Sequence, residues 1–413
     1  MQDDEIIYER YAEGFHENTQ FLSWSITKSI FSLITGMAAF EGKINLSESI
    51  CYYLSEIKKN DELCKVLVVH LLNFTSGIDW QELYEGKGSK SSISQILYGY
   101  GAADIVSFIL KKHRLRSVPG IFWSYSSGDT ILLSAVLQRA YGQEAYEELV
   151  LERFPKAFGL ESFTVEQDPK GVFYASSYSY LSARDLAKIG SFMLKGSGKI
   201  NGRQVMFDNW VRYSTSFTKL GKQGHYLYNP LSLPANSWWI NISSRDYNIR
   251  SPIPYASETY VSARGHWGQL LSIDPEKNLV VVRYGDDRQK RFEEDELMRL
   301  IYQFVDHRAV DEKPELVGNP HLLAFDKSLR SYGEPGLKLR LKTLLFRSFR
   351  AKMFCSCYYI IKPGDDEYCD EYSHFIGPKW AAKIEKNETR RLIRVNRKKS
   401  QFISEEKGCN LFE

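Results

Sequence analysis

The first long apolar stretch of the chain gives a clear structural signal. Residues 30–42, IFSLITGMAAFEG, are apolar almost all the way round a helical projection. A helix that is apolar on every side is buried inside a domain. The sequence therefore predicts a buried helix that starts near Ser25, and the presence of Lys28 in its first turn needs an explanation.

Strand patterns lie at both ends of the first 310 residues. Residues 5–11 (EIIYERY) alternate well enough for a strand, and residues 237–242 (SWWINI) also read as sheet. Within residues 270–286, two apolar stretches flank the turn-forming residues 274–278, which predicts a β-hairpin. Helical patterns dominate the middle. We expect an α/β fold in which an antiparallel sheet is flanked by helices and encloses a helical insert.

Two further signals place helices. Residues 291–308 predict an amphipathic helix on the sheet, because apolar residues follow the i, i+3, i+4, i+7 spacing. These residues are Leu297, Leu300, Ile301 and Phe304. Ser182 and Asp185 form a capping box, in which the serine side chain caps a helix and Asp185 returns to the serine N–H. The capping box is a structural signal without chemistry.

The composition changes beyond residue 310, so we expect residues 1–310 to form one domain and residues 311–413 a separate C-terminal extension. Residues 337–363 carry seven Lys or Arg and no acidic residue, and residues 390–399 are also basic. Three interpretations stay open for this basic, aromatic extension: peripheral contact with an anionic membrane surface, binding of a partner, or packing on the domain. We expect the domain to fold and work without it.

Composition narrows the class of protein. The 413 residues are 43% hydrophobic and 25% charged, with a formal net charge of +3, as in a soluble globular protein with no sign of nucleic-acid binding. The longest apolar runs, such as residues 66–72, are far shorter than the roughly 20 residues of a membrane-spanning helix. The acidic start, residues 1–10, lacks the pattern of a secretory signal. On the chain as given, we expect a cytoplasmic protein.

The six cysteines are too sparse for a disulfide framework, so we expect thiols. They are Cys51, Cys64, Cys355, Cys357, Cys369 and Cys409. A zinc site formed by three of the later cysteines and His374 is disfavoured, because the C-x-C spacing departs from the usual knuckle and no second knuckle follows. We expect neither a metal nor another cofactor.

The pair Ser25 and Lys28 is a candidate nucleophile and base. The same spacing recurs at Ser55/Lys58, Ser216/Lys219 and Ser404/Lys407. The spacing alone is therefore weak, and a helix N-cap with a solvated lysine is the plain alternative. The predicted burial of the helix favours the catalytic interpretation over this alternative. A serine hydroxyl needs a base to become a nucleophile, and burial lowers the pKa of a lysine from its ordinary value of about 10.4.

Two more motifs follow the serine-lysine pair in the chain. The stretch FWSYSSGDTILLSAV places Tyr125 in a polar loop before a helix, and ARGHWGQLLSID places His266, Trp267 and Gly268 at the head of a strand. In this order the three motifs resemble the penicillin-binding, class C β-lactamase-like serine hydrolases. The chain is most similar to the branch with 6-aminohexanoate-dimer hydrolase and related carboxylesterases. The resemblance covers roughly residues 5–308.

The resemblance implies a β-lactamase-like fold and a role for each motif. Ser25 would be the nucleophile, and Lys28 and Tyr125 would share the proton transfers, with the base of each step left open. The backbone N–H groups of Ser25 and Gln269 would stabilise the oxyanion, while Gly268 leaves room for the substrate.

Three further positions bear on the substrate. His266 takes the place of the lysine that holds a substrate carboxylate in β-lactamases, and Trp267 narrows the same wall. Ser127 replaces an asparagine, which suits the esterase and amide-hydrolase branch. Trp238, Trp239 and Tyr260 near the bordering strand are either core or substrate walls.

We therefore expect a serine hydrolase that forms an acyl-enzyme on Ser25 and cleaves a small ester or linear amide. The alternatives are a non-catalytic binding protein on a retired hydrolase scaffold, or a β-lactamase or D-alanyl peptidase. Only 24 residues precede Ser25, whereas the resemblance implies a full strand hairpin there. The start is misassigned, the chain is truncated, or the sheet has a bare edge; the first two readings leave export open.

Overall fold

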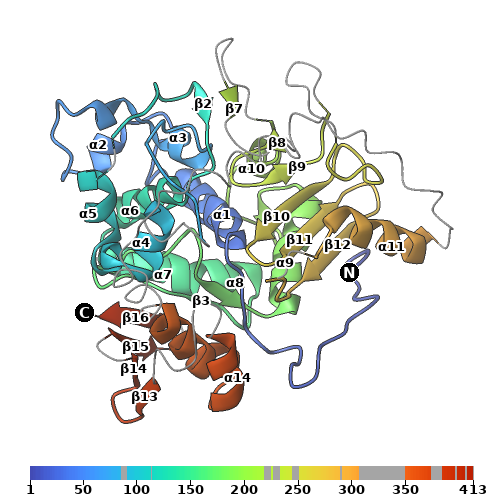
Figure 1. Ribbon diagram of the computed structural model, residues 1–413. Coiled ribbons are helices and arrows are strands. Elements are labelled where there is room, and N and C mark those ends of the chain that lie inside the picture. The colour runs from blue at the N-terminus through green and yellow to red at the C-terminus, as the bar shows by residue number, and fades with distance from the viewer. Residues whose placement is uncertain are drawn as a thin grey trace.

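A five-stranded antiparallel sheet in the order β12-β11-β10-β9-β8 is the largest sheet that the structure describes (Figure 1). Its strands are β8 (Leu233–Pro234), β9 (Trp239–Ile240), β10 (Val261–Gly265), β11 (Gln269–Asp274) and β12 (Leu279–Arg283). The predicted strand at 237–242 and the hairpin at 270–286 are both confirmed. This computed structural model describes residues 1–84, 91–112, 114–217, 225–226, 233–243, 251–288, 291–306, 349–373, 384–395, 398–404 and 407–412.

Helices cover both faces of this sheet because side chains alternate along each strand. On one face, α9 (Ala183–Lys195) packs on β11 and β12, and a Cβ on Gly190 would lie 2.5 Å from Val280, so only glycine allows this approach. On the other face, α11 (Glu294–Asp306) buries Met298 and Tyr302 against Leu279. The α/β architecture with an antiparallel sheet is confirmed.

The helix α1 (Ile26–Phe40) runs through the molecule with residues 26–38 fully buried, as its apolar pattern predicts. It contacts β10 and β11 on one side and the helical insert on the other. The α-helices of the insert are α2 (Ile50–Tyr53), α3 (Val68–Leu72), α4 (Ser92–Tyr98), α5 (Ile105–Lys112), α6 (Ser127–Tyr141), α7 (Gln143–Glu148) and α8 (Phe154–Phe158).

A small antiparallel sheet lies directly before the start of α1. Its order is β1-β4-β3, and its strands are β1 (Phe21–Leu22), β3 (Thr164–Val165) and β4 (Ser179–Leu181). The N–H of Ser23 donates to the carbonyl of Ser179 at 2.9 Å, which extends the pairing almost to Ser25. This sheet therefore sets the position at which α1 begins.

The remaining short elements of the described chain connect these parts. They are the helices Glu62–Lys65, Tyr100–Ala103, Leu149–Arg153 and α10 (Trp210–Ser214), and the strands β2 (Phe122–Trp123), β5 (Lys199–Ile200), β6 (Arg203–Gln204) and β7 (His225–Tyr226). No helix in the described part of the chain is both long and apolar enough to cross a membrane.

Three expectations about strands and helices need correction. Residues 5–11 form no strand and are exposed along most of their length. Only residues 1–2 reach the sheet, where the N–H of Val280 donates to the carbonyl of Met1 at 2.8 Å. A strand needs a partner, and the alternation of EIIYERY finds none here.

The other two corrections concern helices. The helix α11 forms where expected, but Leu300 and Phe304 are 49% and 56% exposed. The buried face of this helix therefore lies about one position away from the predicted face. Ser182 does cap α9 by accepting from the N–H of Asp185 at 3.1 Å. The Asp185 carboxylate, however, accepts from the N–H of Ser162 rather than from that of Ser182.

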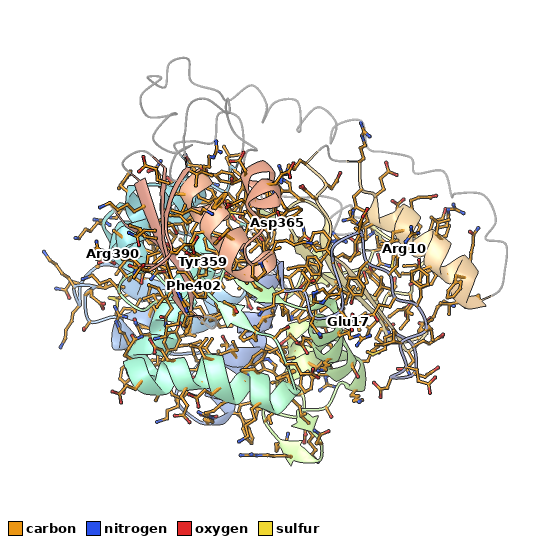
Figure 2. All side chains as sticks on the ribbon, turned by 90° about the horizontal axis from the view of Figure 1, so that it is seen from below. Arg10, Glu17, Tyr359, Asp365, Arg390 and Phe402 are labelled. Atoms are coloured by element: carbon orange, nitrogen blue, oxygen red, sulfur yellow. A yellow bond between two sulfur atoms is a disulfide. The ribbon has the colours of Figure 1, made fainter. Side chains whose placement is uncertain are left out.

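The described residues between 349 and 412 lie beneath the helical insert, in red in Figure 1, and share its hydrophobic core. Residues 349–356 are helical and continue into Cys357–Ile361 and α14 (Asp366–Tyr372). An antiparallel sheet follows, with strands β13 (Ile384–Asn387), β14 (Leu392–Val395), β15 (Lys398–Ser404) and β16 (Gly408–Phe412). Tyr359 stacks on Phe402, with ring centroids 4.8 Å apart, and the two labelled residues lie close together in Figure 2.

Several basic residues in the described part of the extension are engaged with the protein itself. Arg350 pairs with Asp370, Lys352 pairs with Glu166, and Lys362 donates to the carbonyl of Gly14. Arg350 and Lys352 are 3% and 1% exposed. The described part of the basic stretch 337–363 thus favours packing on the domain over contact with a membrane, and it argues against the expectation that the domain works without the extension.

All six cysteines form disulfides, so the expectation of thiols is wrong. The pairs are Cys51–Cys64, Cys355–Cys409 and Cys357–Cys369. The cysteines considered for zinc are therefore bridged, and His374 lies outside the described residues. Disulfides form and persist in oxidising compartments. The three bridges argue against the cytoplasmic expectation.

We predict that removal of the Cys355–Cys409 bridge lowers the free energy of unfolding more than removal of Cys51–Cys64. The bridges span 54 and 13 residues, and a longer closed loop removes more entropy from the unfolded chain, with typical stabilisation of about 2–4 kcal/mol. Urea unfolding of the two double-alanine variants measures the difference. An equal or larger loss from the shorter loop would contradict this account.

Candidate active site

Ser25 lies at the start of α1 with its hydroxyl available for chemistry. It occupies the N-cap position, yet its side chain makes no capping hydrogen bond, which removes the plain structural explanation. Trp24 before it adopts a left-handed backbone with φ of 47°. The ammonium Nζ of Lys28, one turn further on, lies 3.1 Å from Oγ of Ser25 as a hydrogen-bond donor.

Lys28 is the buried cation at the centre of the site, with a relative exposure of 2%. Its Nζ also donates to the carbonyl of Ser176 at 2.9 Å and lies 4.8 Å from the ring centroid of Tyr125. Burial lowers the pKa of Lys28 to about 8, and the Glu82 carboxylate opposes this shift. Near neutral pH, a useful fraction of the amine is therefore uncharged and able to accept a proton.

Tyr125 reaches the site from the loop between β2 and α6. Its ring stacks on Trp239, with centroids 5.7 Å apart, and packs against Phe74 at 5.2 Å. The structure thus brings the three predicted catalytic residues around one narrow cavity of about 10 Å³, which has room for about one water molecule. The other lining residues are Ser29, Phe74, Trp123, Ser237, Trp238, Trp239 and Arg264.

Glu82 is a residue of the site that sequence reasoning missed. Its carboxylate accepts hydrogen bonds from the N–H of Ser127 at 3.0 Å and from the Ser127 hydroxyl at 2.6 Å. It also accepts from Trp80 and Tyr84. Ser127 is fully buried by this arrangement, so its hydroxyl organises the loop after Tyr125. The stretch ELYEG holds no motif or spacing that marks Glu82 as a residue of the site.

His266 and Trp267 gather around Trp24 rather than around the cavity at Lys28. The His266 ring stacks on Tyr84 at 4.9 Å and meets Trp24 edge-on at 5.4 Å. The Trp267 ring lies 5.3 Å from that of Trp24. Both residues belong to the turn that joins β10 to β11, so this turn borders the residue that precedes Ser25.

The other two residues of this motif shape the turn. Gly268 has φ of 81°, and a Cβ there would lie 2.5 Å from the Arg283 side chain. These contacts explain the glycine by backbone geometry. The side-chain amide of Gln269 donates to the carbonyls of His266 and Gly285, at 3.0 and 2.6 Å. The oxyanion role of the Gln269 N–H stays a prediction.

Of the aromatic residues near the bordering strand, two line the cavity and one belongs to the core. Trp238 and Trp239 both contribute to its wall, and the indole N–H of Trp238 is fixed by a 3.0 Å hydrogen bond to Ser32. Tyr260 instead packs with α11, where its hydroxyl donates to Glu294 at 2.8 Å.

Comparison with known proteins agrees with this geometry. The family model described as Beta-lactamase matches residues 1–303. The chain belongs to the Beta-lactamase family. A 6-aminohexanoate-dimer hydrolase of Paenarthrobacter ureafaciens is 25% identical over 293 residues, covering 68% of this chain and 70% of the relative. An uncharacterized protein of Alkalihalophilus pseudofirmus is 27% identical over 303 residues, covering 66% and 75%.

Among solved structures, a candidate 6-aminohexanoate-dimer hydrolase from Bacillus anthracis superposes with a TM-score of 0.60 at 22% identity, covering 74% of this chain and 78% of its own. A candidate β-lactamase from Bacteroides dorei gives a TM-score of 0.56 at 12% identity, covering 75% and 92%. These likenesses confirm the β-lactamase-like fold. The family match ends before the extension, so the family does not account for residues 349–412.

We predict that the rate of covalent labelling by a fluorophosphonate rises with pH and levels off above a midpoint near the pKa of Lys28, about 8. The neutral amine is the form that accepts the proton, and its fraction increases about tenfold per pH unit below the midpoint. Stopped labelling reactions between pH 6 and 10 measure the profile.

Lys28→Arg is the decisive control for this profile, because a guanidinium keeps its proton at every working pH. We expect Lys28→Arg and Lys28→Ala to label at least about 100-fold more slowly than wild type. Near wild-type labelling of the arginine variant would show that Lys28 acts only through its charge and that Tyr125 is the base.

Proposed function

We propose that the protein is a serine hydrolase that forms an acyl-enzyme on Ser25 and cleaves a small ester or a linear amide. One observation carries the proposal: the uncapped Ser25 hydroxyl lies 3.1 Å from the amine of a buried lysine. A lysine whose pKa is lowered by burial serves as a base near neutral pH. Membership of the Beta-lactamase family, whose members are serine hydrolases, supports the same chemistry.

The reaction runs in two halves. Oγ of Ser25 attacks the substrate carbonyl while its proton passes to Nζ of Lys28, and the N–H groups of Ser25 and Gln269 stabilise the oxyanion. The proton then reaches the leaving alcohol or amine through the Tyr125 hydroxyl, and the carbon–heteroatom bond breaks. Water attacks the acyl-enzyme by the reverse proton route and regenerates Ser25.

The relatives and the walls of the site support the proposed substrate class. One relative is named for a hydrolase of the 6-aminohexanoate dimer, which is a linear amide. Phe74, Trp123 and Trp239 give the cavity an aromatic wall and leave only about 10 Å³ beside Ser25, so a bulky acyl group has little room there. This reasoning favours short acyl groups.

Two other functions remain as alternatives. A retired scaffold that only binds a ligand has no need of a buried lysine beside an uncapped serine hydroxyl, because an ammonium is costly to bury. A β-lactamase or D-alanyl peptidase needs a firm cation for the substrate carboxylate. The resemblance assigns that position to His266, whose ring packs between Tyr84 and Trp24.

We predict that Ser25→Ala abolishes both hydrolysis and fluorophosphonate labelling while the protein stays folded. The substitution removes a side chain that makes no cap, so its cost in stability should not exceed about 1 kcal/mol. Labelling gels and thermal unfolding test both parts together. Covalent labelling that persists in this variant would place the nucleophile elsewhere.

We also predict that p-nitrophenyl acetate and butyrate are hydrolysed with a higher kcat/KM than a chromogenic cephalosporin. The resemblance puts the packed ring of His266 where β-lactamases have a lysine, so that position offers no lysine ammonium to a substrate carboxylate. Loss of a firm charge contact weakens carboxylate binding by roughly ten- to a hundredfold. A cephalosporin kcat/KM that equals the ester value and disappears in Ser25→Ala would establish a β-lactamase instead.

A further inference from the structure

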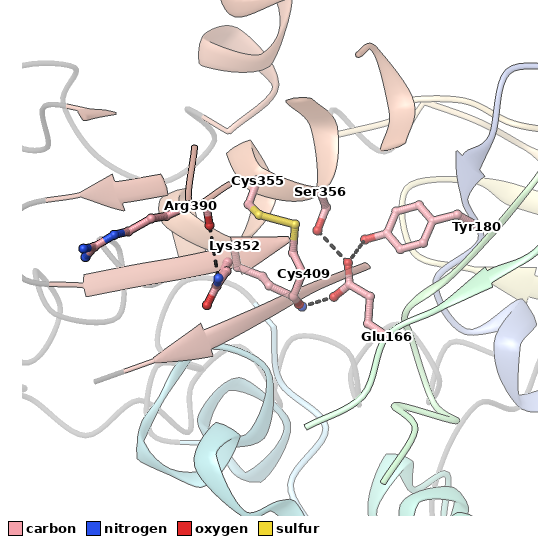
Figure 3. Close-up of a disulfide and its surroundings, with 8 residues drawn as sticks. Glu166, Tyr180, Lys352, Cys355, Ser356, Arg390 and Cys409 are labelled. Carbon is pink, nitrogen blue, oxygen red and sulfur yellow. Dashed lines mark hydrogen bonds and ion pairs between the residues drawn. A yellow bond between two sulfur atoms is a disulfide. The ribbon is translucent and has the colours of Figure 1, made fainter. Parts of the chain in front are cut away.

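A buried ion pair joins the extension to the domain beneath the active site. Lys352 donates to the carboxylate of Glu166 and to the carbonyl of Cys409 (Figure 3). Both charged side chains are almost fully enclosed, with relative exposures of 2% and 0%. The Cys355–Cys409 disulfide fixes the strand that supplies the carbonyl. Burial lowers the pKa of Lys352, whereas the adjacent Glu166 carboxylate favours the charged amine. The extension therefore supplies the partner for a carboxylate that the domain has buried.

Glu166 is held by both parts of the molecule. The hydroxyl of Ser356 in the extension donates to its Oε1 at 2.7 Å, and that of Tyr180 in β4 donates to the same atom at 3.0 Å. Figure 3 shows these groups converging on the carboxylate. The Glu166 carboxylate thus accepts hydrogen bonds from the extension and from β4, the strand that pairs with β1.

The backbone of Glu166 closes the base of a short loop, residues 174–178. Its N–H donates to the carbonyl of Tyr178 at 3.0 Å, and its own carbonyl accepts from the N–H of Tyr174 at 2.8 Å. The ammonium of Lys352 also lies 4.7 Å from the ring centroid of Tyr178. Lys352 thus contacts both Glu166, which closes the loop at its base, and Tyr178, an aromatic residue of the loop.

The tip of the same loop touches the catalytic lysine. Ser176 is fully buried, and its carbonyl accepts a 2.9 Å hydrogen bond from Nζ of Lys28. This carbonyl and Oγ of Ser25 together orient the amine. A shift of the loop would therefore move an acceptor that aims the amine at the nucleophile.

We propose that Lys352 is a positioning residue for the hydrolysis: through Glu166 and the loop 174–178, the C-terminal extension holds the Ser176 carbonyl against Lys28. This inference rests on the proposed function of Ser25 and Lys28. Removal of Lys352 leaves Glu166 buried without its cation, a state that rearranges or takes up water. The loop loses its anchor, and misplacement of a catalytic group by about 1 Å costs on the order of 100-fold in rate.

The test compares Lys352→Met with a matched control, Lys407→Met. Lys407 also joins the extension to the domain, through a 2.6 Å ion pair with Glu147, but that pair is partly exposed and anchors to α7 rather than to the loop. Fluorophosphonate titration gives the concentration of active sites, so kcat is expressed per folded, competent molecule. Hydrogen exchange of the amides in residues 174–178 reports the loop independently of activity.

We expect Lys352→Met to lower kcat per titrated site at least about tenfold with KM changed less than about twofold, and to speed exchange in residues 174–178. Lys407→Met should leave kcat per titrated site, KM and the exchange of residues 174–178 unchanged. A purely structural role would reduce the number of titrated sites but keep their kcat. Wild-type kcat per site in Lys352→Met, or an equal loss in Lys407→Met, would overturn the proposal.

A double variant keeps the test decisive if Lys352→Met does not fold. Lys352→Met combined with Glu166→Gln removes both buried charges, while the amide oxygen introduced in place of the carboxylate can still accept from Ser356 and Tyr180. Slow turnover and fast exchange in this variant support the proposal, and wild-type values overturn it. If the wild-type protein shows no turnover that depends on Ser25, the proposed function fails, and hydrogen exchange alone still decides whether Lys352 holds the loop.

Discussion

The enclosure of the Lys28 amine is the constraint on which the rest of the site depends. An ammonium in the core is unfavourable unless its donors find acceptors and its charge finds a partner. Here two oxygens accept from Nζ, those of Ser25 and Ser176, and the Glu82 carboxylate lies close enough to oppose the fall in pKa. A base that is uncharged in part near neutral pH results from this balance between burial and a nearby acid.

The cost of burying a charged group arises a second time, at Glu166. Glu166 is a fully buried carboxylate, and it is compensated by Lys352 and by two hydroxyl donors. The two buried charges are linked through the loop 174–178, whose base hydrogen-bonds to Glu166 and whose tip hydrogen-bonds to Lys28. Residues far apart in the sequence thus form one polar network, in which each group relies on the next for its partner.

The sequence predicted those elements and site residues that are marked by local periodicity or by ordered motifs. The buried helix α1 and the hairpin β11 and β12 followed from local periodicity, whereas the meeting of Ser25, Lys28 and Tyr125 followed from the resemblance of three ordered motifs to a known family. Glu82, the disulfide pairing and the docking of the extension followed from neither, because they depend on contacts between distant residues that leave no spacing pattern. Residues 5–11 alternate like a strand but find no partner strand, and α11 turns Met298 inward because Leu279 and Tyr260 lie there to receive it.

The boundary of the functional unit therefore differs from the boundary of the family match. The Beta-lactamase match ends at residue 303 and includes Glu166, yet the cation that compensates this carboxylate lies at residue 352. A buried acid without a cation is strongly unfavourable, whereas the complete pair is tolerated when further hydrogen bonds satisfy it. The physical unit that holds the catalytic lysine in place consequently includes residues of the extension, since Lys352 supplies the partner of the charge that the domain buries.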